Sequence, residues 1–154
     1  MKKILNAYLN RIGPKIKAAN TLIEKQINNN FAGMIKEYSL TGAQISLMVF
    51  LYDSKGRTIT QKEIEDAFIL SHPTIRGIVK RLEDSKLIWT SHLKTDQRQI
   101  VLTLSNKGFN LIDKNIAKIH KILDDTNEKI VGDLSSQEIS HLEQILDRII
   151  ADFK

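Results

Sequence analysis

The 154-residue chain has no cysteine, and no apolar run in it approaches the roughly 18 to 20 residues that cross a bilayer. Without cysteine there is no disulfide framework, no thiolate metal site and no thiol redox switch. The first residues, Met1 to Asn6, also lack the sustained apolar stretch and small-residue cleavage site of a signal peptide. These absences predict a cytoplasmic protein without a membrane partner.

Signatures of catalysis and of metal binding are missing as well. The sequence has no glycine-rich phosphate loop, no nucleophile elbow and no carboxylate pair at a meaningful spacing. The four histidines, His72, His92, His120 and His141, are scattered, and no two of them have the i, i+4 spacing of a metal-binding helix. We therefore expect no enzyme, no catalytic residue, no metal site and no cofactor.

The chain contains 42% apolar and 27% charged residues. Its length and composition are typical of one globular domain or one subunit of a small oligomer. The formal net charge of +5 favours an anionic partner, of which nucleic acid is the commonest. The charge is concentrated, because the stretch from Ser71 to Arg98 has six Lys and Arg against three Asp and Glu. That stretch alone supplies +3 of the +5.

Both ends of the chain have helical periodicity. Apolar residues recur every three or four positions from Ile4 to Ile27, which predicts an amphipathic helix. Within it Gly13-Pro14 predicts a kink or a boundary, and Asn28-Asn29-Asn30 predicts a break after it. Two further helices are predicted from about Asn106 to Ile130 and from Gln137 to Phe153.

Three segments have the pattern of a capping box, in which a hydroxyl and a Gln or Glu side chain satisfy the free donors of a first helical turn. These segments are Thr41-Gly42-Ala43-Gln44, Thr60-Gln61-Lys62-Glu63 and Ser135-Ser136-Gln137-Glu138. Each predicts the start of a helix. The helix after Thr60 is short, from about Gln61 to Phe68.

A further helix is predicted to begin at Ser71, an N-cap residue, with Pro73 tolerated in its first turn. The period then changes. Ile88 to Leu93 and Ile100 to Leu104 are rich in β-branched and aromatic residues and are predicted to be strands. The polar segment from Lys94 to Arg98 joins them as a turn.

The predicted fold is mainly α with a small β-hairpin wing: a winged helix-turn-helix between helical ends. Residues 40–104 are expected to form the DNA-binding domain, and residues 1–39 and 105–154 a helical dimerisation region. The dimer prediction depends on the last helix, whose apolar stripe is wider than packing on a small winged helix requires. That stripe consists of Ile139, Leu142, Ile145, Leu146, Ile149, Ile150 and Phe153.

The helix after Ser71 has an apolar stripe formed by Ile75, Ile78, Val79 and Leu82. Seven residues share its other side: Ser71, His72, Thr74, Arg76, Gly77, Lys80 and Arg81. A helix in the major groove reads bases from its N-terminal turns, so we expect the first four to face bases and the last two mainly phosphates. Gly77 allows close approach of the backbone, and a protonated His72 would add a base or phosphate contact. The alternative is an ordinary solvated helix face.

The predicted hairpin turn contains Lys94, Thr95, Asp96, Gln97 and Arg98. An Arg at a hairpin tip can enter a narrow minor groove, where the negative potential is strongest. Asp96 is placed to hold the guanidinium of Arg98 by a charge-assisted hydrogen bond. The alternative is that a turn favours Asp and tolerates Arg, and chemistry alone does not separate the two.

Together these segments resemble the MarR family. The matching motifs are Thr60-Gln61-Lys62-Glu63-Ile64, Ser71-His72-Pro73-Thr74-Ile75, Val79-Lys80-Arg81-Leu82-Glu83, Leu87-Ile88, Asp96-Gln97-Arg98 and Leu102-Thr103-Leu104-Ser105-Asn106-Lys107-Gly108. The resemblance covers about residues 40 to 112, and the helical ends agree in length and place. Each motif alone is weak, but the set is specific.

The resemblance implies a homodimeric transcription regulator, usually a repressor, that binds a palindromic operator in double-stranded DNA. The helix after Ser71 would be its recognition helix, and Arg98 would reach the minor groove. We also expect Thr60 and Gln61 to contact the DNA backbone. Many members release DNA when a small aromatic or anionic effector binds between the dimer helices and the winged helix.

The sequence departs from the family pattern at three positions. Lys86 replaces the usual Gly after the recognition helix, so we expect that helix to end without a left-handed cap. Thr90 stands where a basic residue is common, and Ile69 where a small residue is common. These departures concern specificity rather than fold.

An effector pocket near Tyr38, Met48, Phe50 and Tyr52 is one interpretation of those side chains, and the favoured alternative is that they are core. Two other functions stay open. One is a winged helix that uses its basic face to bind an acidic protein, and the other is a ligand-binding protein without specific DNA binding.

Overall fold

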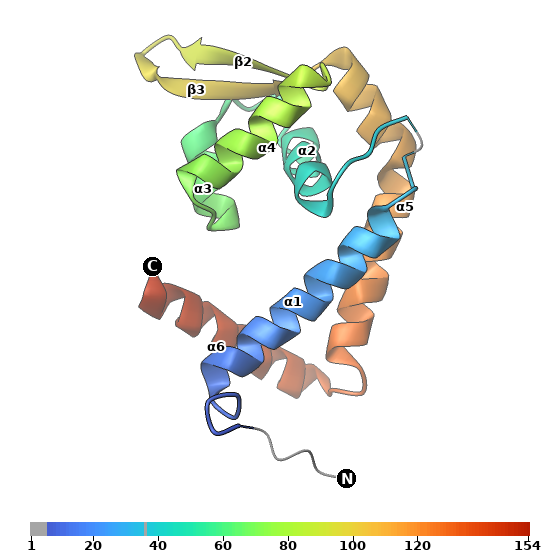
Figure 1. Cartoon of the computed structure of the whole chain (residues 1–154), viewed down its shortest axis with the longest axis vertical. Helices are drawn as coiled ribbons and strands as arrows, with labels where there is room; N and C mark the ends of the chain where they lie inside the picture. Colours follow the sequence, from blue (N-terminus) through green and yellow to red (C-terminus); the bar gives the residue numbers. More distant parts are fainter. Residues whose placement is uncertain (1–5, 36) are drawn as a thin grey trace.

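The computed structural model describes residues 6–35 and 37–154. Their elements are α1 (Ile12–Phe31), α2 (Gly42–Asp53), β1 (Ile59–Thr60), α3 (Gln61–Phe68), α4 (His72–Asp84), β2 (Ile88–Leu93), β3 (Asp96–Leu104), α5 (Asn106–Val131) and α6 (Ser136–Phe153). The hairpin of β2 and β3 extends from the molecule beside α4, and α6 with the C-terminus lies away from it (Figure 1). The predicted class, mainly helical with a small wing, is confirmed.

Hydroxyl side chains start five of these helices, each accepting a hydrogen bond from a backbone N–H of the first turn. The predicted capping boxes at Thr41 and Ser135 are complete, with the return bond to the cap N–H spanning 2.8 and 3.4 Å. At Thr60 only half of the box forms. Its hydroxyl accepts from the Glu63 N–H at 3.2 Å, but the Glu63 carboxylate pairs with Arg57.

The first helix begins later than predicted. Ile4 and Leu5 lie outside the described residues, and residues 6–11 form turns rather than helix. Gly13-Pro14 falls in the first turn of α1, where proline loses no hydrogen bond. This pair therefore marks the boundary of the helix and not a kink within it.

The break predicted at Asn28-Asn29-Asn30 was wrong, because α1 continues through these residues to Phe31. Phe31 is buried at the end of the helix, and the Asn28 side-chain oxygen accepts from the Gly42 N–H at 2.8 Å. Packing of Phe31 and this bond to α2 outweigh the low helix propensity of Asn, which is only a weak preference.

The hairpin differs from its prediction at one strand. β2 has the predicted bounds, but β3 begins at Asp96, so the turn shrinks to Lys94-Thr95. The register changes after the His92–Ile100 pair, because the next pair joins Leu93 to Asp96. A third strand, β1, was not predicted, and it pairs antiparallel with β3 in the order β1-β3-β2.

One core joins the winged-helix elements to α5. Its most buried side chains come from six elements and from the residue before β2: Ile45, Leu47, Met48, Ile59, Ile64, Ile75, Leu82, Leu87, Ile88, Ile112 and Ile119. The stripe predicted on α4 is buried as expected. The opposite face of α4 is thereby fixed toward solvent.

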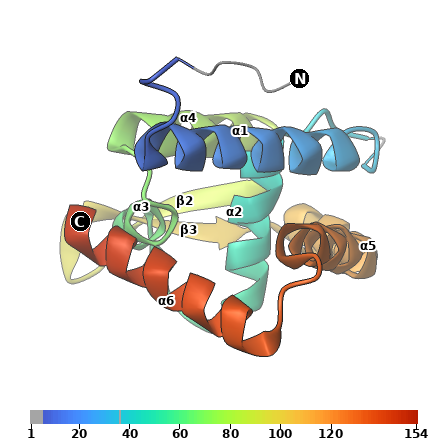
Figure 2. The ribbon, with the colours of Figure 1, turned by 90° about the horizontal axis from the view of Figure 1, so that it is seen from below.

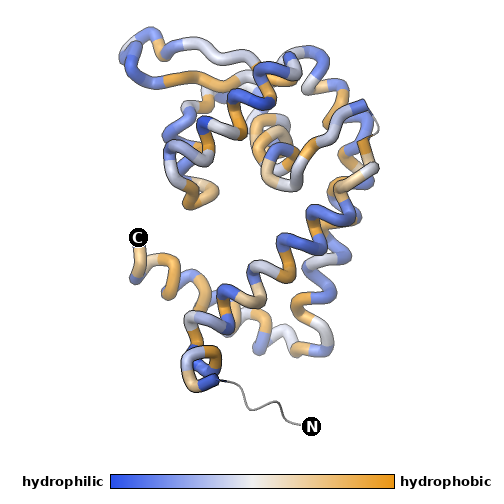
Figure 3. The backbone as a smooth tube through the Cα atoms, in the orientation of Figure 1, coloured by the Kyte–Doolittle hydropathy of each residue, from blue (hydrophilic) through white to orange (hydrophobic). Residues whose placement is uncertain are grey.

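The helices α1 and α5 run side by side away from the winged-helix elements, and Lys129 Nζ donates to Gln26 Oε1 across them at 3.0 Å (Figure 1). From the end of α5 the chain turns into α6, which lies apart from α1 (Figure 2). The structure describes all of α6, and none of its residues is buried. Apolar and polar residues alternate along α1 and α6 (Figure 3). Apolar side chains remain exposed on both helices, for example Ile12, Leu146 and Phe153.

Candidate nucleic-acid interface

The start of α4 is held by the predicted N-cap. Ser71 Oγ accepts from the Thr74 N–H at 3.3 Å and lies 2.9 Å from Thr74 Oγ1. Pro73 occupies the first turn, where its fixed φ suits a helix. The two hydroxyls therefore sit together at the exposed N-terminal tip of the helix.

All seven residues predicted for DNA contact on α4 and its cap lie on the exposed side of the helix: Ser71, His72, Thr74, Arg76, Gly77, Lys80 and Arg81. They stand opposite the buried stripe of α4. A Cβ atom built on Gly77 would meet nothing within 4 Å, so this part of the helix surface is open. The face combines hydroxyl, imidazole and cationic groups, which suits both base edges and phosphates.

A hydrogen-bonded cluster links α3 to the first residue of α4. Glu65 Oε1 lies 2.6 Å from His72 Nδ1 and accepts from Gln61 Nε2 at 3.1 Å. Burial acts to raise the pKa of Glu65, but the bonds from Gln61 and His72 and the charges of His72 and Lys62 outweigh it and lower that pKa. Sequence reasoning missed Glu65, although it lies four residues after Gln61 on the same helix.

The two residues predicted to contact the DNA backbone from α3 have structural tasks. Thr60 is the half-buried N-cap of α3. Gln61 is only 3% exposed, and its amide belongs to the cluster with Glu65 and His72. Gln61 is therefore placed beneath the exposed face of α4 rather than on it.

The wing carries a fixed arginine. Arg98 has a side chain that is 92% exposed, and Asp96 Oδ1 accepts from its backbone N–H at 3.1 Å and from its Nε at 3.2 Å. The backbone bond and then the side-chain bond hold the pKa of Asp96 below its usual value. The bond predicted between the two side chains is confirmed. Lys94, Thr95 and Gln97 are exposed beside them.

A groove of about 390 Å³ separates α4 from the wing. It is lined by Gln61, Arg76, Val79, Lys80, Glu83, Thr90, Ser91, His92 and Ile100. Two cations of α4 thus face the polar residues Ser91 and His92 of β2, which sequence reasoning had not connected with them. Thr90 Oγ1 donates to Glu83 Oε2 at 2.9 Å and ties the wing to α4.

Left-handed residues end both helices of the helix-turn-helix. Lys86 has φ +58°, with its N–H bonded to Glu83 O and the Leu87 N–H bonded to Leu82 O. This is a Schellman motif, so the expectation of an end without a left-handed cap was wrong. Ile69, which caps α3, also has a positive φ of +51°, a conformation that a β-branched residue rarely adopts.

The junction of wing and α5 explains the motif from Leu102 to Gly108. Ser105 Oγ donates to Lys86 O at 2.7 Å and accepts from the Gly108 N–H at 3.0 Å. A Cβ atom on Gly108 would lie 2.0 Å from the backbone oxygen of Leu87. Only glycine lets α5 approach the end of α4 this closely.

The side chains named as a candidate effector pocket do not form one. Met48 is fully buried, and Tyr38 and Phe50 pack against the core. Tyr52 stacks on Phe109 and donates to Asp113 at 2.6 Å, and that bond raises the pKa of Tyr52. The alternative reading of these residues, as packed side chains, agrees with the structure.

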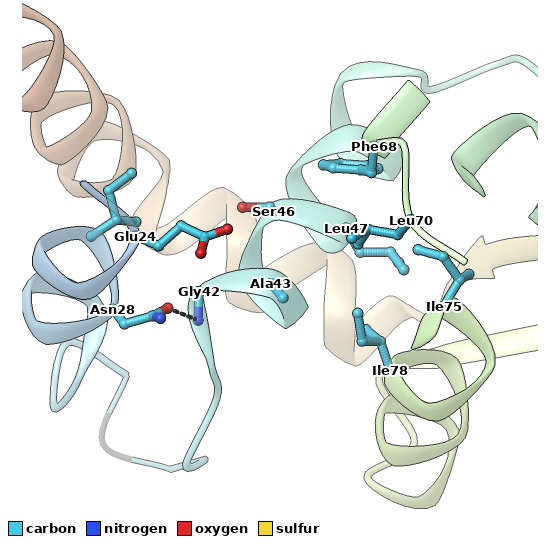
Figure 4. A pocket seen from close by; sticks show the side chains of 11 residues that line it. Glu24, Asn28, Gly42, Ala43, Ser46, Leu47, Phe68, Leu70, Ile75 and Ile78 are labelled. Atoms are coloured by element: carbon cyan, nitrogen blue, oxygen red, sulfur yellow. Dashed lines mark hydrogen bonds between the residues drawn. The ribbon is translucent and has the colours of Figure 1, made fainter. Parts of the chain in front are cut away.

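A different cavity, of about 440 Å³, lies between α1 and the winged-helix elements (Figure 4). Glu24 and Asn28 extend into it from α1, opposite the apolar side chains of Leu47, Phe68 and Ile75. The cavity borders the buried side of α4 and therefore lies directly behind the candidate interface.

Within residues 6–35 and 37–154, no three His, Asp or Glu side chains are grouped as ligands for a metal ion. No helix in the same residues is long and apolar enough to cross a membrane.

The fold and this site define a winged helix-turn-helix transcription regulator of the MarR type. The solved structure of MarR from Oenococcus oeni is 26% identical with a TM-score of 0.69, covering 92% of this chain and 99% of its own. The Staphylococcus aureus MepR–DNA complex has a TM-score of 0.75 at 19% identity, covering 92% and 98%. The S. aureus HTH-type transcriptional regulator MgrA is 24% identical over 133 residues, 84% of each chain.

Residues 30–115 match the family described as transcriptional regulator SarA/Rot. The chain belongs to this family of transcriptional regulators, and its relatives are regulators rather than enzymes.

Proposed function

We propose that this chain is a homodimeric, sequence-specific DNA-binding regulator that recognises a near-palindromic operator. The observation that supports it most is the face of α4, where every predicted contact residue is exposed opposite a buried stripe. A structural neighbour, MepR, was solved as a complex with DNA. In the proposed complex α4 enters the major groove with its N-terminal turns toward the bases.

The contacts divide by position along the interface. Ser71, His72, Thr74 and Arg76 face bases, whereas Lys80 and Arg81 bind phosphates. The groove between α4 and the wing, with Arg76 and Lys80 on one wall, is suited to the phosphate backbone. Arg98, fixed by Asp96, enters the minor groove, together with its exposed neighbours Lys94, Thr95 and Gln97. Thr60 and Gln61, at the start of α3, contact the DNA backbone, and Gln61 also holds the cluster beneath α4.

In this proposal the helical ends of the chain form the dimer interface. Residues 1–39 and 105–154 form the dimerisation region, and residues 40–104 the DNA-binding domain. The support is the apolar surface that a single chain leaves uncovered on α6, where Ile145, Leu146, Ile150 and Phe153 are 38 to 88% exposed. A second copy buries this surface and brings two α4 helices to successive major grooves, roughly 34 Å apart.

We also propose, as the MarR resemblance implies, that the protein represses transcription and that a small effector relieves this repression. The cavity behind α4 supports an effector, because a molecule bound there would press on α1 and α4 together. Its apolar wall suits an aromatic ring, and the Glu24 carboxylate disfavours an anion. Of the two effector classes expected from the resemblance, the aromatic one fits this cavity better.

The test is selection of fragments of the source genome by the purified protein at physiological salt. We expect enrichment of one inverted repeat with half-sites about ten base pairs apart, including copies upstream of regulated genes. Weak binding without sequence preference would favour the alternative of a basic face for an acidic protein. Tight binding of an aromatic compound with no enriched DNA would favour a ligand-binding protein.

A further inference from the structure

The carboxylate of Glu65 decides where the imidazole of His72 carries its proton. An ionised carboxylate only accepts hydrogen bonds, so the 2.6 Å contact requires a hydrogen on His72 Nδ1. Gln61 Nε2, which lies 3.3 Å from Nδ1, is then a second donor to the same carboxylate. A neutral imidazole with its hydrogen on Nδ1 has a lone pair on Nε2.

The position of His72 exposes that lone pair to the DNA face. His72 is the first residue of α4, and its side chain is 57% exposed whereas that of Glu65 is 17% exposed. Lys62 on α3 is close enough to lower the pKa of Glu65, and Arg76 follows His72 by one turn along α4. The imidazole is thus anchored at Nδ1, and within residues 6–35 and 37–154 no hydrogen bond to its Nε2 is found.

We propose that Glu65 makes neutral His72 a hydrogen-bond acceptor and thereby selects a base whose exocyclic amine, adenine N6 or cytosine N4, faces Nε2. This inference rests on the proposed DNA recognition by α4. In the major groove only these two amines donate, whereas purine N7, guanine O6 and thymine O4 accept. The other tautomer of the imidazole would select those acceptors. Glu65 is a positioning residue that acts through His72.

The test uses the DNA site selected by the wild-type protein, at pH 8, because alkaline solution favours the neutral form of an imidazole. His72→Ala first identifies the base pair whose preference is lost. At that pair the amine-bearing base is replaced by an analogue without the amine, purine for adenine or 2-pyrimidinone for cytosine. In a second duplex the natural adenine or guanine of that pair is replaced by its 7-deaza analogue, which lacks the N7 acceptor.

We expect loss of the amine to weaken wild-type binding by about 5-fold, as for one hydrogen bond, and to leave the affinity of His72→Ala unchanged. The 7-deaza duplex should bind as tightly as the natural one. Weaker binding of the 7-deaza duplex together with indifference to the amine would overturn the proposal, because Nε2 would then be the donor.

The role of Glu65 is tested separately. Glu65→Leu removes the acceptor and should abolish the dependence on the amine, whereas Glu65→Gln keeps an acceptor oxygen and should retain most of it. In the His72→Ala background neither substitution should change base preference. The control is Glu63→Gln, a carboxylate on the same helix that pairs with Arg57, and it should leave the amine dependence intact.

The failure of this inference can be distinguished from the failure of the proposed function. If Glu65→Leu weakens binding to every sequence equally and the amine dependence persists, Glu65 has only a structural role and the inference is wrong. If the wild-type protein selects a site but His72→Ala changes no base preference, the inference fails and the proposed function stands. If the wild-type protein selects no site, both fail.

Discussion

Asp96 orients the side chain of Arg98 on the wing. The guanidinium is almost fully exposed, yet two hydrogen bonds to one carboxylate oxygen restrict where it points. An exposed ion pair of this kind contributes little to stability, so its value lies in presenting a cation that is already oriented.

We expect Arg98→Ala to weaken binding to the selected DNA site at least 10-fold, because a charge-assisted contact in the minor groove is lost. Asp96→Ala keeps the cation but frees it, and should cause a smaller loss. Titration of labelled DNA measures both. The control is Lys121→Ala, which removes an exposed cation paired with Asp125 on α5 and should leave affinity unchanged. Equal affinities for wild type and Arg98→Ala would show that the wing does not touch DNA.

Lys86 and Ile69 hold left-handed conformations without being glycine. The left-handed region costs an L-residue about 1 to 2 kcal/mol, so Lys86→Gly and Ile69→Gly should each raise the free energy of unfolding by about 1 kcal/mol. Lys80→Gly, in the interior of α4, should lower it by about 1 kcal/mol. Urea unfolding at neutral pH gives these values. A less stable Lys86→Gly protein would contradict the observed cap.

Among the contacts between elements, α5 approaches the segment between α4 and β2 closely at Gly108. A methyl group on Gly108 would meet the backbone oxygen of Leu87, which cannot move without shifting β2. We expect Gly108→Ala to lower the free energy of unfolding by about 1 to 3 kcal/mol, as overpacking does. Chemical denaturation followed by circular dichroism measures the loss.

Gly77→Ala is the matched control, because it also lies within a helix but has open space around it. It should raise the free energy of unfolding by about 0.5 to 1 kcal/mol through helix propensity. If Gly77 lies close to DNA as proposed, the same protein should bind DNA more weakly although it is more stable. Equal losses of stability in the two variants would refute the packing argument.

Local signals in the sequence were sufficient for most elements. Hydroxyl N-caps placed the starts of α2, α3, α4 and α6 to within a residue, and β-branched residues gave β2. The features that were not predicted depend on contacts between residues that are far apart in the sequence. β1 has two residues and exists only because Ile59 pairs with Leu102, and α1 crosses its asparagines because Phe31 is buried.

Only part of the candidate interface could likewise be predicted from the sequence. The exposed face of α4 follows from helical periodicity and the position of the buried stripe. The contact between Glu65 and His72 could not be predicted from the sequence, because six residues lie between them and one of these, Ile69, has a left-handed conformation. The Lys86 cap was missed because preference for glycine is statistical, whereas two backbone hydrogen bonds hold this lysine in place.

Across the whole molecule, the exposed apolar residues of α6 support the proposed dimer, in which a second copy would cover them. Sedimentation should give twice the 17.6 kDa mass of one chain for the wild-type protein. Replacing Leu146 and Ile150 together by Glu should shift the mass toward one chain and lower DNA affinity, because two half-sites are no longer bound at once. Glu143→Gln, a conservative change at an exposed position of the same helix, should do neither. A wild-type mass of one chain at micromolar concentration would contradict the dimer.

Salt dependence reports the number of phosphates that the proposed dimer would neutralise. If each copy contacts about four, log affinity should fall with log salt at a slope of about −7. Lys80→Ala removes one phosphate contact per copy and should reduce the magnitude of the slope by about 2 while preserving sequence preference. A slope that Lys80→Ala leaves unchanged would remove Lys80 from the backbone contacts.

Sequence reading by α4 is measured by the ratio of the protein's affinities for the selected site and for a scrambled duplex at physiological salt. For the wild-type protein we expect a ratio on the order of 10³ or more. Arg76→Ala should reduce that ratio by roughly 5-fold or more, because it removes a base contact, whereas Lys80→Ala should weaken both affinities and leave the ratio nearly constant. A wild-type ratio near one, or a ratio that Arg76→Ala does not change, would contradict sequence reading by this helix.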